Sequence, residues 1–266
     1  MLDCRQLTRQ GIAALEAGWI EQAEASLAEA IKLCPVDGEA RRYYAETLWL
    51  HGAHREAIAQ LEEASLLDGE DAGPRVRLAE MQLAVGEIQH AGENAERALD
   101  IDPKSAAAWA IRGRVMRTRG QIRQALADYH RSLGYKPDDP QLLLEVAEAH
   151  RELNQPHRAL ATLCRLAEIY PPNEEPQQVL YLTGLAHMAL DRYEDAAAVF
   201  ADAVCRGKPT PEICYRLAEA EMLAGHPDAA AAAAQHALAL QPAHQPSREL
   251  LGELRVTRQA QGTRLR

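Results

Sequence analysis

Histidines and cysteines are the residues of this chain that could most readily bind a metal ion or act as nucleophiles. His51 and His54 lie three residues apart in the segment HGAH and could share a metal ion, although a pair of turn histidines is more often incidental. The sequence holds no HExxH motif and no cysteine–histidine spacing typical of a zinc site or an activated thiol. Glycine-rich phosphate-binding motifs of the form GxGxxG or GxxxxGKS are absent as well. We therefore expect no catalytic residues, no metal and no cofactor, and we do not expect an enzyme.

The five cysteines are odd in number, scattered and without a CxxC pair. This pattern argues against a disulfide framework in a chain of 266 residues. The segment MLDCRQLTRQ has no apolar core, so no secretory signal is visible, and no apolar run approaches the roughly 20 residues that span a bilayer. The sequence therefore predicts a cytoplasmic protein without membrane insertion, periplasmic only if a leader has been removed.

Charge and composition narrow the class of partner. The formal net charge is −10, whereas nucleic-acid binders usually carry a basic surplus, so we expect no nucleic acid. Only four of the 29 basic residues are lysines, and arginine is the cation suited to bidentate contact with carboxylates. Hydrophobic residues make up 47% but aromatics only 5%, so alanine supplies much of the apolar share, which favours closely packed helices.

Small and large apolar residues recur along the chain at a fixed interval, which indicates that a repeating structural element positions its side chains. The interval is 34 residues, except for one step of 37 between Ala159 and Ala196. A large or apolar residue follows four positions after each small one, and a proline closes most units. Such a period is typical of a repeat array in which every unit is one pair of helices. The small residues are Ala23, Ala57, Ala91, Ala125, Ala159, Ala196 and Ala230.

Residues that tolerate a left-handed backbone stand between the two helices of each unit. Five units have glycine there, and the remaining two have Asn154 and Asp191, the non-glycine types that best adopt this conformation. The position therefore predicts a turn that ends one helix and starts the next. The glycines are Gly18, Gly52, Gly86, Gly120 and Gly225.

The segment from Ala106 to Pro137 carries the most complete form of the unit. Trp109, Gly113, the Ala125-x3-Tyr129 pair and Pro137 match the pattern W-x2-L-G-x2-Y, A-x3-F, P, while arginine and methionine replace its leucine and tyrosine. The chain therefore resembles the tetratricopeptide repeat family. The resemblance implies an all-α fold, a right-handed superhelical solenoid of antiparallel helix pairs. It also implies that the first helices line a concave groove where partner peptides or helices bind.

We expect seven repeats in a single solenoid, a capping helix and a frayed tail. The three extra residues between Ala159 and Ala196 fall in the loop PPNEEP, which either carries a local specialisation or, as we expect, eases packing between repeats. The predicted repeats are 4–37, 38–71, 72–105, 106–139, 140–173, 177–210 and 211–244, followed by a cap at 246–258 and a tail at 259–266.

Carrying the groove positions over from the family gives two candidate contact regions. The first combines arginines with aromatic residues on neighbouring repeats and could grip an acidic peptide or a terminal carboxylate, unless its arginines merely pair with Glu46 and Glu80. The second is apolar and could bury a partner's side chains, unless it is core between repeats. The first region comprises Arg9, Arg42, Tyr43, Trp49 and Arg77; the second Tyr181, Leu182, Leu185 and Tyr215; Arg114 and Arg216 are further groove positions.

The function predicted from these observations is a non-catalytic scaffold that binds a segment of another protein. One alternative is an assembly or docking factor of a bacterial envelope, secretion or polysaccharide-export machine. Another is an accessory platform for a separate enzyme. The lysine–asparagine chaperone-tail clamp known in this family is not matched at the corresponding positions, nor is the asparagine ladder of its sugar-transferase relatives.

Overall fold

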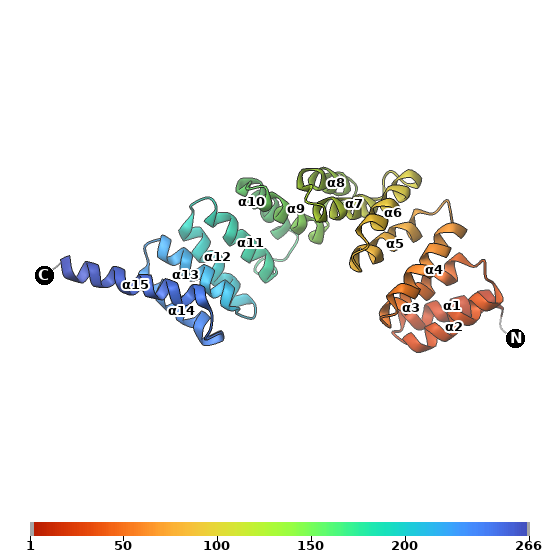
Figure 1. Ribbon diagram of the computed structural model, residues 1–266, viewed down its shortest axis with the longest axis horizontal. Helices are drawn as coiled ribbons and strands as arrows, with labels where there is room; N and C mark the ends of the chain where they lie inside the picture. Colours follow the sequence, from red (N-terminus) through yellow and green to blue (C-terminus); the bar gives the residue numbers. More distant parts are fainter. Residues whose placement is uncertain (1–2, 265–266) are drawn as a thin grey trace. The chain divides into compact units, whose positions relative to one another are not determined.

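The computed structural model describes residues 3–264, and every regular element in that range is an α-helix (Figure 1). This confirms the predicted all-α class. The helices are α1 (Cys4–Glu16), α2 (Ile20–Leu33), α3 (Gly38–Leu50), α4 (His54–Leu67), α5 (Ala72–Ala84), α6 (Ile88–Ile101), α7 (Ala106–Thr118), α8 (Ile122–Tyr135), α9 (Pro140–Glu152), α10 (Pro156–Ala167), α11 (Gln177–Met188), α12 (Tyr193–Arg206), α13 (Pro211–Leu223), α14 (Pro227–Leu240) and α15 (Gln245–Arg264).

The helices pack in antiparallel pairs, α1 with α2 through α13 with α14, and each predicted repeat range encloses one pair. Two compact units contain them. The first unit, Met1–Pro137, holds α1 to α8, and the second unit, Asp138–Arg266, holds α9 to α15. Below, each unit is described by itself.

The turns within the pairs have the predicted left-handed backbone. All five predicted glycines have φ between 75° and 88°, and Asn154 and Asp191 have φ of 54° and 56°. One further residue, Asn173 in the inserted loop, has φ of 67°, which the repeat pattern did not predict. Except in the fifth and sixth pairs, glycine therefore makes the sharp stop between helices that turns each pair back on itself.

The two helices of a pair approach closely because a small residue on the first faces a larger one on the second. A Cβ atom added to Gly113 in α7 would lie 2.4 Å from a ring carbon of Tyr129 in α8. One added to Gly184 in α11 would lie 2.5 Å from a ring carbon of Phe200 in α12. Both rings are fully buried, and the alanines that open the second helices are at most 2% exposed. The predicted column of small residues is thus the seam along which each pair is packed.

The arginine that departs from the family pattern has a local partner. Arg112 donates two hydrogen bonds, of 2.8 and 2.7 Å, to the buried carboxylate of Asp128 in α8. The Arg112 and Arg131 guanidinium groups lie 4.4 and 4.6 Å from the centre of the Trp109 ring. The indole nitrogen of Trp109 donates to the carbonyl of Pro103 at 2.8 Å. An ion pair here replaces the apolar contact that leucine makes in the family pattern.

The inserted loop between α10 and α11 is fastened to α12 by one side chain. Arg206 binds the carboxylate of Glu175, donates to the Asn173 side chain at 3.1 Å, and pairs with Asp202 of its own helix at 2.6 Å. The extra residues therefore form an anchored loop inside the second unit.

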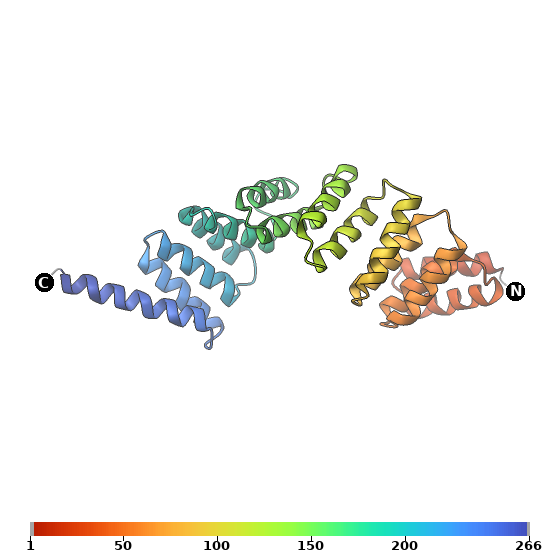
Figure 2. The same ribbon diagram turned by 45° about the horizontal axis from the view of Figure 1, so that its top comes forward.

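The last helix covers the end of the final pair, and it is longer than predicted. Leu250 and Leu254 are buried against Ala218, Ala230 and other alanines of α13 and α14, as a cap requires. The helix runs to Arg264, so most of the predicted tail 259–266 is helical, while residues 265 and 266 lie outside the described range. In both views its far end extends past α13 and α14 (Figures 1 and 2).

Candidate functional site

One arginine of the predicted basic–aromatic region is saturated by acids. Arg77 in α5 donates two hydrogen bonds to the Glu46 carboxylate, at 2.6 and 2.7 Å, and one to Glu80 at 2.9 Å. The hydrogen bonding of its guanidinium to the Glu46 carboxylate is the main reason that the pKa of Arg77 is raised. Its charge is compensated, so Arg77 is better placed to hold α3 against α5 than to receive a partner's carboxylate.

The neighbouring positions on α3 combine a cation with half-buried aromatic rings. The Arg42 guanidinium lies 5.1 Å from the centre of the Tyr43 ring and 3.8 Å from the Asp71 carboxylate, which is too long for a hydrogen bond. Trp49 packs on the core between α3, α4 and α5, and its ring lies 4.2 Å from the ring of His54. The Arg42 guanidinium can therefore still donate hydrogen bonds to a partner, whereas that of Arg77 already donates to Glu46 and Glu80.

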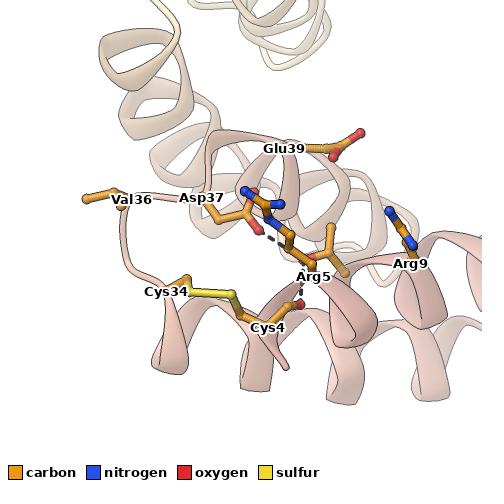
Figure 3. A pocket seen from close by; sticks show the side chains of 8 residues that line it. Cys4, Arg5, Arg9, Cys34, Val36, Asp37 and Glu39 are labelled. Atoms are coloured by element: carbon orange, nitrogen blue, oxygen red, sulfur yellow. Dashed lines mark hydrogen bonds between the residues drawn. A yellow bond between two sulfur atoms is a disulfide. The ribbon is translucent and has the colours of Figure 1, made fainter. Parts of the chain in front are cut away.

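A hollow in the surface of the first unit lies at the first repeat (Figure 3). It has a volume of about 470 Å³ and is lined by the start of α1 and by the loop into α3. The side chains of Arg5 and Arg9 point away from α1, on the side where Asp37 and Glu39 lie. Within residues 3–264 neither guanidinium has an ion pair. Two open cations therefore border a hollow large enough for a side chain or a chain terminus.

Asp37, one of the acidic residues that line this hollow, already accepts hydrogen bonds from within the protein. Asp37 accepts a hydrogen bond from the backbone N–H of Ala40, capping α3, and another from the Thr8 hydroxyl, each at 3.0 Å. The same Thr8 hydroxyl also donates to the carbonyl of Cys4 at 3.0 Å. Because Asp37 is held in this way, it closes the wall of the hollow without neutralising Arg5 or Arg9.

A second hollow of about 580 Å³ adjoins the first and shares Glu39 with it. Arg42 is its one basic lining residue, and carboxylates supply most of the rest. The lining of the first hollow combines two arginines with two carboxylates, Asp37 and Glu39, whereas the lining of the second is mainly acidic at the loop between α4 and α5. The acidic residues that line the second hollow are Glu39, Asp68, Glu70 and Asp71.

A disulfide bond between Cys4 and Cys34 forms part of the first hollow, contrary to the sequence-based expectation. The expectation was wrong because it considered the number and spacing of cysteines alone. Cys4 opens α1 and Cys34 ends α2, so the antiparallel pair brings these two ends together. The predicted repeat boundaries contained that signal. Of the other three cysteines, Cys164 and Cys205 are free and exposed.

The predicted apolar region of the second unit is packed against its core. Leu182 is buried and, with Leu185, borders a small cavity of about 50 Å³ between α9, α10 and α11. Tyr181 and Leu185 pack on the cluster around Phe200. Tyr215 packs on the cluster that receives α15. The structure accounts for these side chains by packing between repeats, the alternative that the sequence left open.

The two remaining groove arginines lie in different settings. Arg216 in α13 donates to Glu212 at 2.8 Å and to Glu219 at 3.0 Å, and it lies 5.3 Å from the Tyr215 ring centre. It is therefore paired, like Arg77. Arg114 lies half-buried on α7.

The histidines and cysteines considered above as metal ligands or nucleophiles contact other side chains of the protein. His51 pairs with Glu24 at 2.6 Å, so it faces α2, while His54 lies against Trp49. The fold does bring Cys214 within 3.7 Å of His236, a pairing that their spacing does not predict. Burial raises the pKa of the Cys214 thiol, which disfavours the reactive thiolate. Residues 3–264 contain no cluster of three potential metal ligands, and none of their helices is long and apolar enough to cross a membrane.

Comparison with known proteins identifies the same repeat in this chain. A family model described as the tetratricopeptide repeat matches residues 8–74, 117–174 and 173–212, more than half of the chain. The chain belongs to the tetratricopeptide repeat family. A search of curated proteins gave no match.

Solved tetratricopeptide structures share the fold at low sequence identity. A protein from Cytophaga hutchinsonii is 15% identical with a TM-score of 0.71, the match covering 92% of this chain and 99% of that one. One from Parabacteroides merdae is 15% identical with a TM-score of 0.66, covering 94% and 98%. YrrB, described as a tetratricopeptide protein with an unusual peptide-binding site, is 20% identical with a TM-score of 0.64, covering 71% and 96%. At these identities the likeness shows an all-α helical solenoid and no more.

Proposed function

We propose that this tetratricopeptide protein is a non-catalytic scaffold that binds a carboxylate-bearing segment of another protein along the first helices of its first unit. The observation that carries the proposal is the difference between its arginines. Arg77 is saturated by glutamates, whereas Arg9 and its neighbour Arg5 border a hollow with their guanidinium groups unpaired among the described residues. A guanidinium in this state offers the paired N–H donors that a carboxylate accepts.

The fold supports the class of function. The tetratricopeptide fold supports a protein–protein interaction scaffold, and its members are generally non-catalytic. The neighbour YrrB is described as having a peptide-binding site, which agrees with a peptide segment as the ligand. Arg42, which lies over the Tyr43 ring and lines the second hollow, would contact such a segment beyond the first hollow. The acidic second hollow would then favour a basic side chain further along it.

The test is selection from a random peptide library on the purified chain, followed by affinity measurement by fluorescence anisotropy. We expect selected peptides to be enriched in aspartate and glutamate, or to depend on a free C-terminal carboxylate. We expect the Arg9→Glu/Arg42→Glu variant to bind them at least about tenfold more weakly, because repulsion replaces attraction at two positions. The matched control is Arg55→Glu/Arg97→Glu, which reverses two exposed arginines on the second helices α4 and α6.

Equal affinity of the parent and the Arg9→Glu/Arg42→Glu variant would contradict the proposal, as would selected peptides without carboxylates. Arg77 is left unchanged in this test. Arg77→Glu would place a third carboxylate beside Glu46 and Glu80, so a loss of binding could come from damage to the packing of α3 on α5.

A further inference from the structure

The walls of the first hollow come from two segments that a disulfide joins. The beginning of α1 supplies Arg5 and Arg9, and the segment that leads from α2 into α3 supplies Asp37 and Glu39. Cys4 lies next to Arg5 in α1, and Cys34 ends α2 three residues before Asp37. The bond therefore connects the wall that carries the cations to the wall that faces them (Figure 3).

Few other polar contacts hold these walls together. A side-chain hydrogen bond between them runs from the Thr8 hydroxyl to the Asp37 carboxylate, at 3.0 Å. The start of α1 is otherwise held by its own cap, in which Asp3 accepts from the N–H of Arg5 and donates its N–H to Gln6. Helix ends fray readily unless side chains or cross-links hold them. The disulfide supplies that tie at the helical turn that carries Arg5.

We propose that the hollow binds one carboxylate of the partner segment between Arg5 and Arg9, and that the Cys4–Cys34 disulfide switches this site between tight and weak binding. This inference rests on the proposed function, and it adds the binding group and its regulation. With the bond formed, Arg5 and Arg9 are held one helical turn apart facing the hollow. A carboxylate then meets donors that are already in place, which lowers the entropy lost on binding.

Reduction of the disulfide would disconnect the start of α1 from the segment that follows α2. A dithiol reductant attacks one sulfur, the S–S bond breaks, and two electrons and two protons pass to Cys4 and Cys34 as the dithiol closes into its own disulfide. Both cysteines are half-buried and border the hollow, so a thiolate can reach them. The first turn of α1 would then move independently of the loop before α3, and Arg5 would lose its fixed position.

The experiment uses the full chain and a tetra-glutamate peptide that is acetylated at its N-terminus and amidated at its C-terminus, with the identically capped tetra-glutamine as the neutral comparison. The chain carries Cys164→Ser and Cys205→Ser, which remove the exposed free thiols and keep the effect of the reductant at the disulfide. We expect the oxidised chain to bind tetra-glutamate roughly five- to tenfold more tightly than the same chain after dithiothreitol, in line with the loss of preorganisation. A further variant with Cys4→Ser and Cys34→Ser should bind as weakly as the reduced chain and ignore the reductant.

Three results would overturn the inference. Equal affinity in the oxidised and reduced chains would remove the switch. Unchanged affinity in the oxidised Arg5→Ala/Arg9→Ala variant would remove the carboxylate pocket. Loss of the folded tryptophan fluorescence on reduction would show that the bond is needed for folding and not for binding. Equal affinity in the oxidised and reduced chains would leave the expectation for library-selected peptides and the Arg9→Glu/Arg42→Glu variant unchanged, so failure of the switch is distinguished from failure of the proposed function.

Discussion

Replacement of Gly113 by alanine tests the packing seam that defines each helix pair. The new Cβ would lie 2.4 and 2.5 Å from two ring carbons of Tyr129 and 3.2 Å from the carbonyl oxygen of Ala125. Real Cβ atoms do not approach so closely, and the Tyr129 ring is fully buried with no space to retreat. Overpacking of this kind costs about 1–3 kcal/mol.

An opposing effect must be subtracted. Alanine is favoured over glycine inside a helix by about 1 kcal/mol. We therefore expect Gly113→Ala to lower the free energy of unfolding by up to about 2 kcal/mol. Gly134→Ala in α8 is the matched control, because nothing lies within 4 Å of its added Cβ and the residue is exposed. Helix propensity alone acts there, so this variant should be more stable by up to about 1 kcal/mol.

Tryptophan fluorescence during guanidinium unfolding is the assay. All three tryptophans, Trp19, Trp49 and Trp109, lie in the first unit, so the signal reports on that unit alone. Adding Tyr129→Leu to Gly113→Ala recreates the alanine–leucine pairing of the second and fifth repeats and should recover part of the loss. If Gly113→Ala were as stable as Gly134→Ala, the close approach would not be what requires glycine.

Two further predictions concern charged groups in the packing. Arg112→Leu restores the leucine of the family pattern but leaves the buried Asp128 carboxylate with only a 3.7 Å contact to Arg131. The free energy of unfolding, measured with denaturant, should therefore fall by about 2 kcal/mol. Adding Asp128→Leu should recover most of this loss. The pKa of His187 is lowered from 6.5, chiefly by burial, so the unfolded chain binds more protons than the folded chain just below pH 6.5. Stability of the second unit should therefore fall as pH drops through that range and should change less in His187→Gln, as measured by circular dichroism.

The fold could be predicted from the sequence because each column of the repeat has one physical task. The alanine that opens each second helix must be small, and the turn position must accept a left-handed backbone, so residue type alone reveals both. The structure differs at the C-terminus, where α15 continues to Arg264. The apolar positions Leu250 and Leu254 indicated the start of that helix, but the mainly polar sequence beyond them gave no signal for its end.

The site was predictable only in part, because a groove position does not say what its side chain already contacts. Arg9 and Arg77 look alike in the repeat pattern. In the structure Arg77 meets Glu46 from the preceding first helix, whereas Arg9 borders an open hollow. Such pairing depends on side-chain contacts between repeats and not on the spacing within one. The Cys4–Cys34 bond was missed for a related reason, since it joins two helix ends that are 30 residues apart.

The most direct test of the binding surface is to locate a bound peptide. A library-selected peptide that carries a benzophenone photo-crosslinker is irradiated with the purified chain, and mass spectrometry identifies the residues to which it attaches. The proposed function predicts attachment to α1, α3 or α5, lost in Arg9→Glu/Arg42→Glu and kept in Arg55→Glu/Arg97→Glu. Attachment confined to the second helices or to the second unit, Asp138–Arg266, would contradict it.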